Sequence, residues 1–168
     1  LEEPEAGVAR EVGMIEVRGA NVFQGYWNAP QKNAESFRAD GFFITGDVGR
    51  FDAQGYLYIV GRAKDLIITG GYNVYPVEVE EAINALPGVI ESAVIGIAHA
   101  DFGEAVTAVI ALAADATLDE AGVIAALKRR LAGFKVPKRV LFVPDLPRNA
   151  MGKVQKQGLR VTHARLYA

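Results

Sequence analysis

Two places in the first half of the chain carry charged residues whose types and spacing could support binding chemistry. Asp47 follows Thr45-Gly46, and a carboxylate beside a glycine at the start of a strand can be presented to a diol. An ordinary turn aspartate would give the same pattern. Arg62 and Asp65 lie close together in sequence, and a surface ion pair worth ~0–1 kcal/mol is the plainer interpretation of them.

Gly152-Lys153 is a third place, near the carboxyl-terminal end. A Walker loop needs a glycine five positions before Gly152 and a hydroxyl residue after the lysine, and this chain has Pro147 and Val154 there. A lysine on a glycine-flexed loop could still deliver one positive charge to a phosphate or carboxylate, and a solvated lysine is the alternative. The fourth place is a basic run, more often a solvated helix end than an anion site: Lys128, Arg129, Arg130, Lys135, Lys138 and Arg139.

The composition excludes several classes of protein. Of 168 residues, 51% are hydrophobic and 23% charged, which is typical of a globular protein. The formal net charge of −2 gives no indication of nucleic acid or an anionic membrane as a partner. There is no cysteine, so disulfides, thiolate metal sites and a cysteine nucleophile are excluded. His99 and His163 lack ligand spacing, and we predict no metal site.

No signal-peptide pattern is present, and the longest nearly apolar run, Val106 to Ala114, is far short of the ~20 residues that a membrane span needs. We therefore expect a cytoplasmic protein without a membrane anchor. The chain opens with Leu1-Glu2-Glu3-Pro4, and we expect it to be a piece of a longer protein.

The segment from Gly61 to Pro76 is a joint between two patterns. Before it, short strands are predicted over 13–18, 42–45, 47–51 and 56–60, with one helix over 30–37. This small sheet has no helix long enough to cover it and needs a partner surface. Within the joint, Gly70-Gly71 can take positive φ or admit a ligand close to the backbone, and a tight hairpin is the simpler alternative.

After the joint the pattern mixes helices and strands. A helix begins near Pro76, and Pro87-Gly88 ends it. Strands are predicted over 89–98, 105–113 and 140–143. Thr117 and Glu120 match a capping box for a second helix, with Gly133 beyond its end. Residues 155–166 favour a terminal helix.

Each signal alone is weak, but their order is specific. The sequence resembles the carboxyl-terminal portion of the acyl-CoA synthetases of the adenylate-forming superfamily, over essentially the whole chain. Within that class it looks most like malonyl-CoA synthetases and their small-acid relatives. The resemblance is carried by Gly25-Tyr26-Trp27, by residues 41–47 (GFFITGD), 61–65 (GRAKD), 70–76 (GGYNVYP) and 101–104 (DFGE), and by residues 147–153 (PRNAMGK).

The resemblance implies a two-step reaction. A carboxylate attacks the α-phosphorus of ATP, supplied with Mg²⁺, giving an acyl-adenylate and pyrophosphate, and the thiol of coenzyme A then displaces AMP. Lys153 matches the catalytic lysine of adenylation, and Asp47 and Arg62 would bind the nucleotide. Lys64 and Asp65 occupy the hinge. Gly70, Gly71 and Tyr72 would line the pantetheine channel.

The resemblance also implies an α+β fold. Residues 1–62 would be the terminal β-hairpin lobe of a large N-terminal domain, and residues 64–168 a mobile C-terminal domain with a small three-stranded sheet and packed helices. The ATP phosphate loop and the acyl pocket belong to the missing part of that N-terminal domain. We therefore predict that the fragment alone is inactive.

Partners and alternatives follow from the same resemblance. The partners would be a small carboxylic acid, ATP, coenzyme A, the N-terminal domain of the same chain and a lysine acetyltransferase acting on Lys153. One alternative is an adenylation module that hands its acyl group to a carrier-protein thiol. Another is a non-catalytic interaction domain built on this fold.

Overall fold

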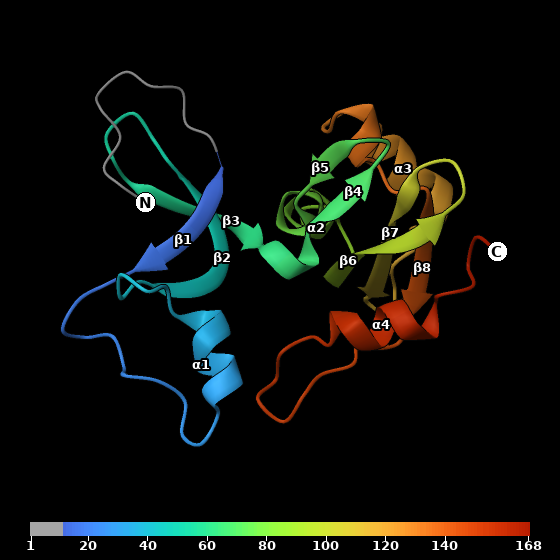
Figure 1. The fold of residues 1–168 in the computed structure, drawn as a ribbon. Coiled ribbons are helices and arrows are strands. Elements are labelled where there is room, and N and C mark those ends of the chain that lie inside the picture. The colour runs from blue at the N-terminus through green and yellow to red at the C-terminus, as the bar shows by residue number, and fades with distance from the viewer. Residues whose placement is uncertain (1–11) are drawn as a thin grey trace. The chain divides into compact units, whose positions relative to one another are not determined.

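The computed structural model describes residues 12–168 and divides into two compact units, Leu1–Lys64 and Asp65–Ala168. Residues 1–11 of the expected 1–62 lobe lie outside the described residues. Each unit is described by itself (Figure 1).

The first unit is built on an antiparallel sheet in the order β1-β2-β3. Its strands are β1 (Gly13–Val17), β2 (Phe43–Phe51) and β3 (Leu57–Arg62), and one short helix, α1 (Pro30–Ser36), precedes β2. The two strands predicted over 42–45 and 47–51 form one strand, in which Gly46, with a φ of 76°, lies at an irregularity in the pairing with β1. The expected β-hairpin lobe is therefore present.

A turn of Asp52 to Tyr56 joins β2 to β3, and its aspartate oxygen accepts the N–H groups of Gln54 and Tyr56. The aromatic rings of Phe23, Phe37 and Phe43 pack edge-to-face or tilted, with centroids 5.1–5.4 Å apart. Phe23 therefore packs against Phe37 and Phe43, whereas Trp27 is 97% exposed.

The second unit contains a sheet of five strands in the order β5-β4-β7-β6, with β8 pairing parallel to β7. Its strands are β4 (Ile67–Thr69), β5 (Tyr72–Val74), β6 (Val89–His99), β7 (Gly103–Leu112) and β8 (Arg139–Val143). The α+β class is confirmed. The three predicted strands are β6, β7 and β8, but the strand count was too low because the joint itself forms β4 and β5.

Three helices cover the two faces of this sheet (Figure 1): α2 (Pro76–Asn84), α3 (Glu120–Lys128) and α4 (Lys156–Thr162). Register pairs Val94 with Ala108 and Ala93 with Val109, so adjacent pairs face opposite sides. Val94 packs in one buried cluster with residues of α2 and α3. Ala93 packs in a second cluster with Leu159 of α4. The sheet is therefore buried on both faces.

The start of α3 differs from expectation. Asp119, not Thr117, is the N-cap of α3, and its carboxylate accepts the N–H of Gly122 at 2.8 Å. Glu120 does not reach back, since its carboxylate binds Arg139 Nε and the Val140 N–H instead.

The ends of α3 and α4 also fall earlier than predicted. Helix α3 ends at Lys128, and Gly133 belongs to a separate 3₁₀ turn, Gly133–Lys135, rather than to the end of the helix. Helix α4 ends at Thr162 instead of continuing to Leu166. Among the described residues, no helix is long and apolar enough to cross a membrane.

Candidate functional site

Asp47 and Arg62 face each other across β2 and β3. The two residues are register partners, and Arg62 Nε lies 2.7 Å from Asp47 Oδ1. Thr45 fixes the approach to Asp47, because its hydroxyl donates to the carbonyl of Ile15 and accepts the Asp47 N–H at 3.0 Å. The predicted Arg62–Asp65 ion pair is therefore wrong, since the strand register gives Arg62 another carboxylate.

Asp65 is held within the second unit. Its Oδ1 accepts from Arg160 Nη2 of α4 at 2.9 Å, and both side chains are largely buried. Lys64, the last residue of the first unit, is exposed and lies with Asp65 in the 3₁₀ turn Ala63–Asp65. The boundary between the units thus falls between an exposed lysine and an anchored aspartate.

Gly70-Gly71 forms the tight hairpin that joins β4 to β5. Both glycines have positive φ, 56° and 81°, as a type I′ turn requires. A Cβ on Gly71 would meet nothing within 4 Å, so this position faces open space. Tyr72 beside it is 58% exposed, and its ring stacks on Phe134 with centroids 4.5 Å apart.

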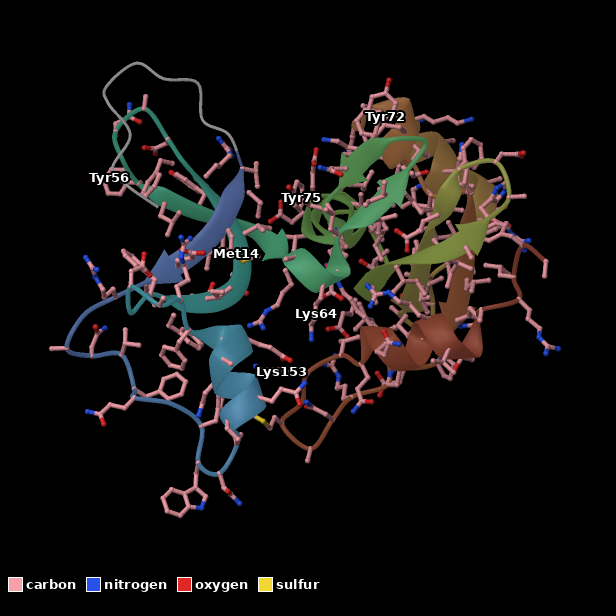
Figure 2. The ribbon with its side chains drawn as sticks, viewed as in Figure 1. Met14, Tyr56, Lys64, Tyr72, Tyr75 and Lys153 are labelled. Carbon is pink, nitrogen blue, oxygen red and sulfur yellow. The ribbon has the colours of Figure 1, made fainter. Side chains whose placement is uncertain are left out.

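Lys153 ends a tight turn in the loop that precedes α4, where Figure 2 labels it. The chain reverses over Asn149 to Gly152, and Gly152 has a φ of 77°. The Lys153 side chain is exposed, and within the described residues its Nζ forms no hydrogen bond or ion pair. By contrast, Lys135 binds Glu78 and Lys156 binds Glu80. Lys153 therefore presents an uncompensated positive charge on an ordered turn.

Both ends of this turn are tied to the sheet. Arg148 donates to the Gly152 carbonyl at 2.7 Å and forms an ion pair with Glu91 of β6. On the other side, Lys156 lies 2.7 Å from Glu80 of α2. The same Glu80 oxygen accepts the N–H of a β6 residue, so both ties lead to β6.

The basic run does not gather into one site. Lys135 and Arg139 are paired with Glu78 and Glu120, and Lys138 lies over the ring of Phe102, 4.7 Å from its centroid. The three at the end of α3 are exposed: Lys128, Arg129 and Arg130. The described part of the chain contains no group of three or more His, Asp or Glu residues that could hold a metal ion. We therefore assign no residue a role toward Mg²⁺.

The structure places the predicted residues in two separate sets. Asp47 and Arg62 are paired in the first unit. In the second unit, Gly70 and Gly71 form one hairpin turn, and Lys153 lies in a different loop.

Sequence reasoning missed Asn149, whose side chain organises the Lys153 turn. An asparagine followed by a glycine–lysine pair is a signal for such a turn, because Asn side chains bind backbone groups a few residues on. It also missed the Asp65–Arg160 and Arg148–Glu91 pairs.

Residues 78–153 match the family model of the AMP-binding enzyme C-terminal domain, and this part of the chain is such a domain. Its homologues are acyl-CoA ligases. The chain is 51% identical over 148 residues to a 7a-methyl-1,5-dioxo-octahydro-1H-inden-4-yl propanoyl:CoA ligase of Rhodococcus jostii (strain RHA1), with 88% of the chain and 29% of the relative covered. It is 44% identical over 153 residues to the indoleacetate–CoA ligase of Aromatoleum aromaticum, covering 91% and 30%.

Solved structures agree with this family. ATP-bound MatB of Rhodopseudomonas palustris matches with 60% identity and a TM-score of 0.88, over 94% of this chain and 31% of that one. Apo MatB matches with 61% identity and a TM-score of 0.70, over 94% and 32%. The chain spans 29–32% of the length of these relatives.

Proposed function

We propose that this chain is the carboxyl-terminal portion of an ATP-dependent acid–CoA ligase. In the first step a substrate carboxylate attacks the α-phosphorus of ATP, and pyrophosphate leaves. In the second, the thiol of coenzyme A attacks the acyl carbon of the adenylate, and AMP leaves. The family of residues 78–153 and the CoA ligases among its relatives support this proposal.

Lys153 is the proposed catalytic residue of the first step. Negative charge accumulates around the α-phosphate and the attacking carboxylate, so a positioned ammonium stabilises the transition state. The observation that carries this role is its exposed Nζ, unpaired among the described residues, on a turn in which the N–H groups of Met151, Gly152 and Lys153 are all hydrogen-bonded. A lysine already neutralised by a carboxylate, as Lys156 is by Glu80, would be a weaker candidate.

Asp47 and Arg62 are the proposed nucleotide-binding pair. A carboxylate can accept both hydroxyls of a ribose, and the guanidinium 2.7 Å away orients it and offers its remaining donors to a phosphate. The Asp47 side chain remains 25% exposed in the pair, so the pairing with Arg62 does not close it off from a ligand. The motif resemblance at residues 41–47 supports the same role.

Lys64 and Asp65 are the proposed hinge. One lysine cannot serve adenylation and then leave room for a thiol unless it moves, and rotation of its domain meets that need. The boundary of the two units between these residues supports a hinge there. The ATP-bound and apo MatB structures match this chain at nearly equal identity but different TM-scores, so those two structures differ from each other over the matched portion.

The proposed pantetheine channel runs beside Gly70, Gly71 and Tyr72. A slender pantetheine arm needs a wall without side chains, and Gly71 gives one because open space lies where its Cβ would be. The exposed Tyr72 ring beside it, supported by Phe134, offers an apolar surface for the arm.

We further propose that residues 1–62 end a larger N-terminal domain. The described part of this unit exposes apolar side chains along β3, at Leu57, Tyr58 and Ile59, with 43–64% of each exposed. A covering surface would bury them. On this proposal, the 168-residue chain alone makes no acyl-CoA, and detecting acyl-CoA formation by it would refute the proposal.

Malonate is the proposed acid. It rests on the sequence resemblance and on the 60% identity to MatB, a malonyl-CoA synthetase. Relatives named for bulkier acids match only moderately less well, which indicates that the acid is selected mainly outside this portion. A carrier-protein thiol as acceptor is the alternative second substrate. It would require a carrier domain in the full gene product.

The first half-reaction of the full-length protein tests the proposal. Lys153→Ala should lower ATP–pyrophosphate exchange with malonate on the order of 10²–10³-fold, the cost of losing one preorganised donor. Lys128→Ala, which removes an exposed lysine from the end of α3, is the matched control and should change nothing. Acetylation of Lys153, which removes its charge, should have the effect of the alanine variant. Normal exchange by Lys153→Ala would favour a non-catalytic interaction domain instead.

A further inference from the structure

Asn149 binds both backbone groups of Lys153. The Asn149 N–H donates to the Lys153 carbonyl at 2.9 Å, and its carboxamide Oδ1 accepts the Lys153 N–H at 2.9 Å. The same Oδ1 accepts the Met151 N–H at 3.0 Å. One side chain therefore satisfies two backbone donors of the turn and closes it onto the lysine.

This arrangement fixes the backbone of Lys153 while leaving its side chain free. A lysine has four flexible carbons, and the cost of ordering them is paid whenever the ammonium is placed. A mobile backbone would add to that cost and spread the ammonium over more positions. With both backbone groups bonded to Asn149, only the side-chain torsions remain to be set when a ligand binds.

We propose that Asn149 is a positioning residue for Lys153 in adenylation, acting through the backbone of the turn and not through contact with substrate. The inference rests on the proposed catalytic role of Lys153. Asn149 itself is partly buried, and its Oδ1 is occupied by the N–H groups of Met151 and Lys153 within the turn. Its carboxamide serves the first half-reaction and has no function in the second.

A matched pair of variants isolates the acceptor oxygen. Asn149→Ala removes it, and Asn149→Ser restores a hydroxyl that can close the same kind of turn more weakly. In the 168-residue chain, ¹⁵N relaxation at the Met151 and Lys153 amides reports the order of the turn. We expect the alanine variant to raise the fast motion of these amides, the serine variant to stay near wild type, and amides of β6 to be unchanged in both.

The functional arm uses the full-length protein. Since a misplacement of about 1 Å can cost ~10²-fold, Asn149→Ala should lower the kcat of adenylation roughly 10–100-fold. Asn149→Ser should recover most of that loss. The release of AMP from preformed acyl-adenylate by coenzyme A should be unchanged in both variants. A residue needed only for folding would lower both half-reactions together.

The outcomes separate this inference from the function on which it rests. If Lys153→Ala abolishes adenylation and Asn149→Ala leaves it intact, the positioning role is wrong and the proposed function stands. Equal losses in both half-reactions, or unchanged amide motion in Asn149→Ala, would also overturn the positioning role. If Lys153→Ala itself has no effect on adenylation, both the proposed function and this inference fail.

Discussion

Arg160 Nη2 lies 2.9 Å from Asp65 Oδ1 and joins helix α4 to the first residue of the second unit. The two side chains are only 21% and 17% exposed. Little solvent screens the pair, so the loss of one partner leaves the other charge poorly solvated. The first residue of the second unit is therefore held in place by a helix near the carboxyl-terminal end of the chain.

Arg160→Ala should lower the free energy of unfolding of the second unit by about 1–3 kcal/mol, the scale of a charged hydrogen bond left unsatisfied. Urea denaturation followed by circular dichroism measures it. Arg139→Ala is the control, because that pair with Glu120 is 37–47% exposed and should contribute less than about 1 kcal/mol. Equal losses for the two variants would contradict the importance of burial at Asp65.

Gly96 makes room for the carboxylate of Glu104. A Cβ on Gly96 would lie 2.7 Å from Glu104 Oε1, and the other carboxylate oxygen accepts the Ile68 N–H at 2.9 Å. Gly96→Ala should therefore cost about 1–2 kcal/mol of unfolding free energy, through crowding and a weakened bond to β4.

A double-mutant cycle checks this cause. In a Glu104→Ala background the crowded atoms are gone, and Gly96→Ala should then cost less than about 0.5 kcal/mol. Additive losses in the double variant would show that the two residues act independently.

The turn of Gly70 and Gly71 predicts different costs for different side chains. Asparagine is favoured at the first position of a type I′ turn, so Gly70→Asn should change stability by less than about 0.5 kcal/mol. Gly70→Ala should cost about 1–2 kcal/mol, because alanine disfavours positive φ. Thermal unfolding compares the two. Equal tolerance of alanine and asparagine would mean that the turn adopts another conformation in solution.

Tyr167 links stability to alkaline pH. Burial raises the pKa of the Tyr167 phenol above 10.0, partly offset by its hydrogen bond with Thr107. As pH rises through 10, the unfolded state loses this proton before the folded state does, so the folded state binds more protons and stability falls. Below pH 10 the protonated Tyr167 phenol makes its full contribution to the free energy of unfolding.

Tyr167→Phe should remove part of this alkaline slope. The measurement is the urea midpoint between pH 8 and 11, with Tyr58→Phe, an exposed tyrosine, as control. If Tyr167→Phe and Tyr58→Phe leave the same slope, the raised pKa of Tyr167 does not govern stability.

The sequence predicted those elements that depend on local pattern. Pro76 marked the start of α2, and the apolar runs marked β6, β7 and β8. Most side chains of β6 and β7 are buried, whereas in β8 only Val140 is fully buried. The tight hairpin at Gly70-Gly71 is confirmed, since positive φ is a local property of glycine.

The errors come from partners distant in sequence. Glu120 matched a capping box, but β8 brings Arg139 and the Val140 N–H to it, and these compete successfully for its carboxylate. Arg62 and Asp65 looked like a pair because they are close in sequence, yet strand register gives one of them Asp47 and helix packing gives the other Arg160. No periodicity encodes such contacts.

The candidate site was predicted as residues and not as an arrangement. Lys153, Asp47 and Gly71 were identified by motif, and their roles stay predictions. The support beneath Lys153 was missed, because Asn149 was considered only as part of the motif at residues 147–153, and its side-chain bonds to the Met151 and Lys153 amides were not predicted.

The ties of Arg148 to Glu91 and of Lys156 to Glu80 have a mechanical consequence. Arg148 holds one side of the loop to β6, and Lys156 holds the other side to α2, so the backbone of the turn cannot open as a flap without breaking these ion pairs. A large displacement of the Lys153 backbone therefore requires the five-stranded sheet to move together with the loop.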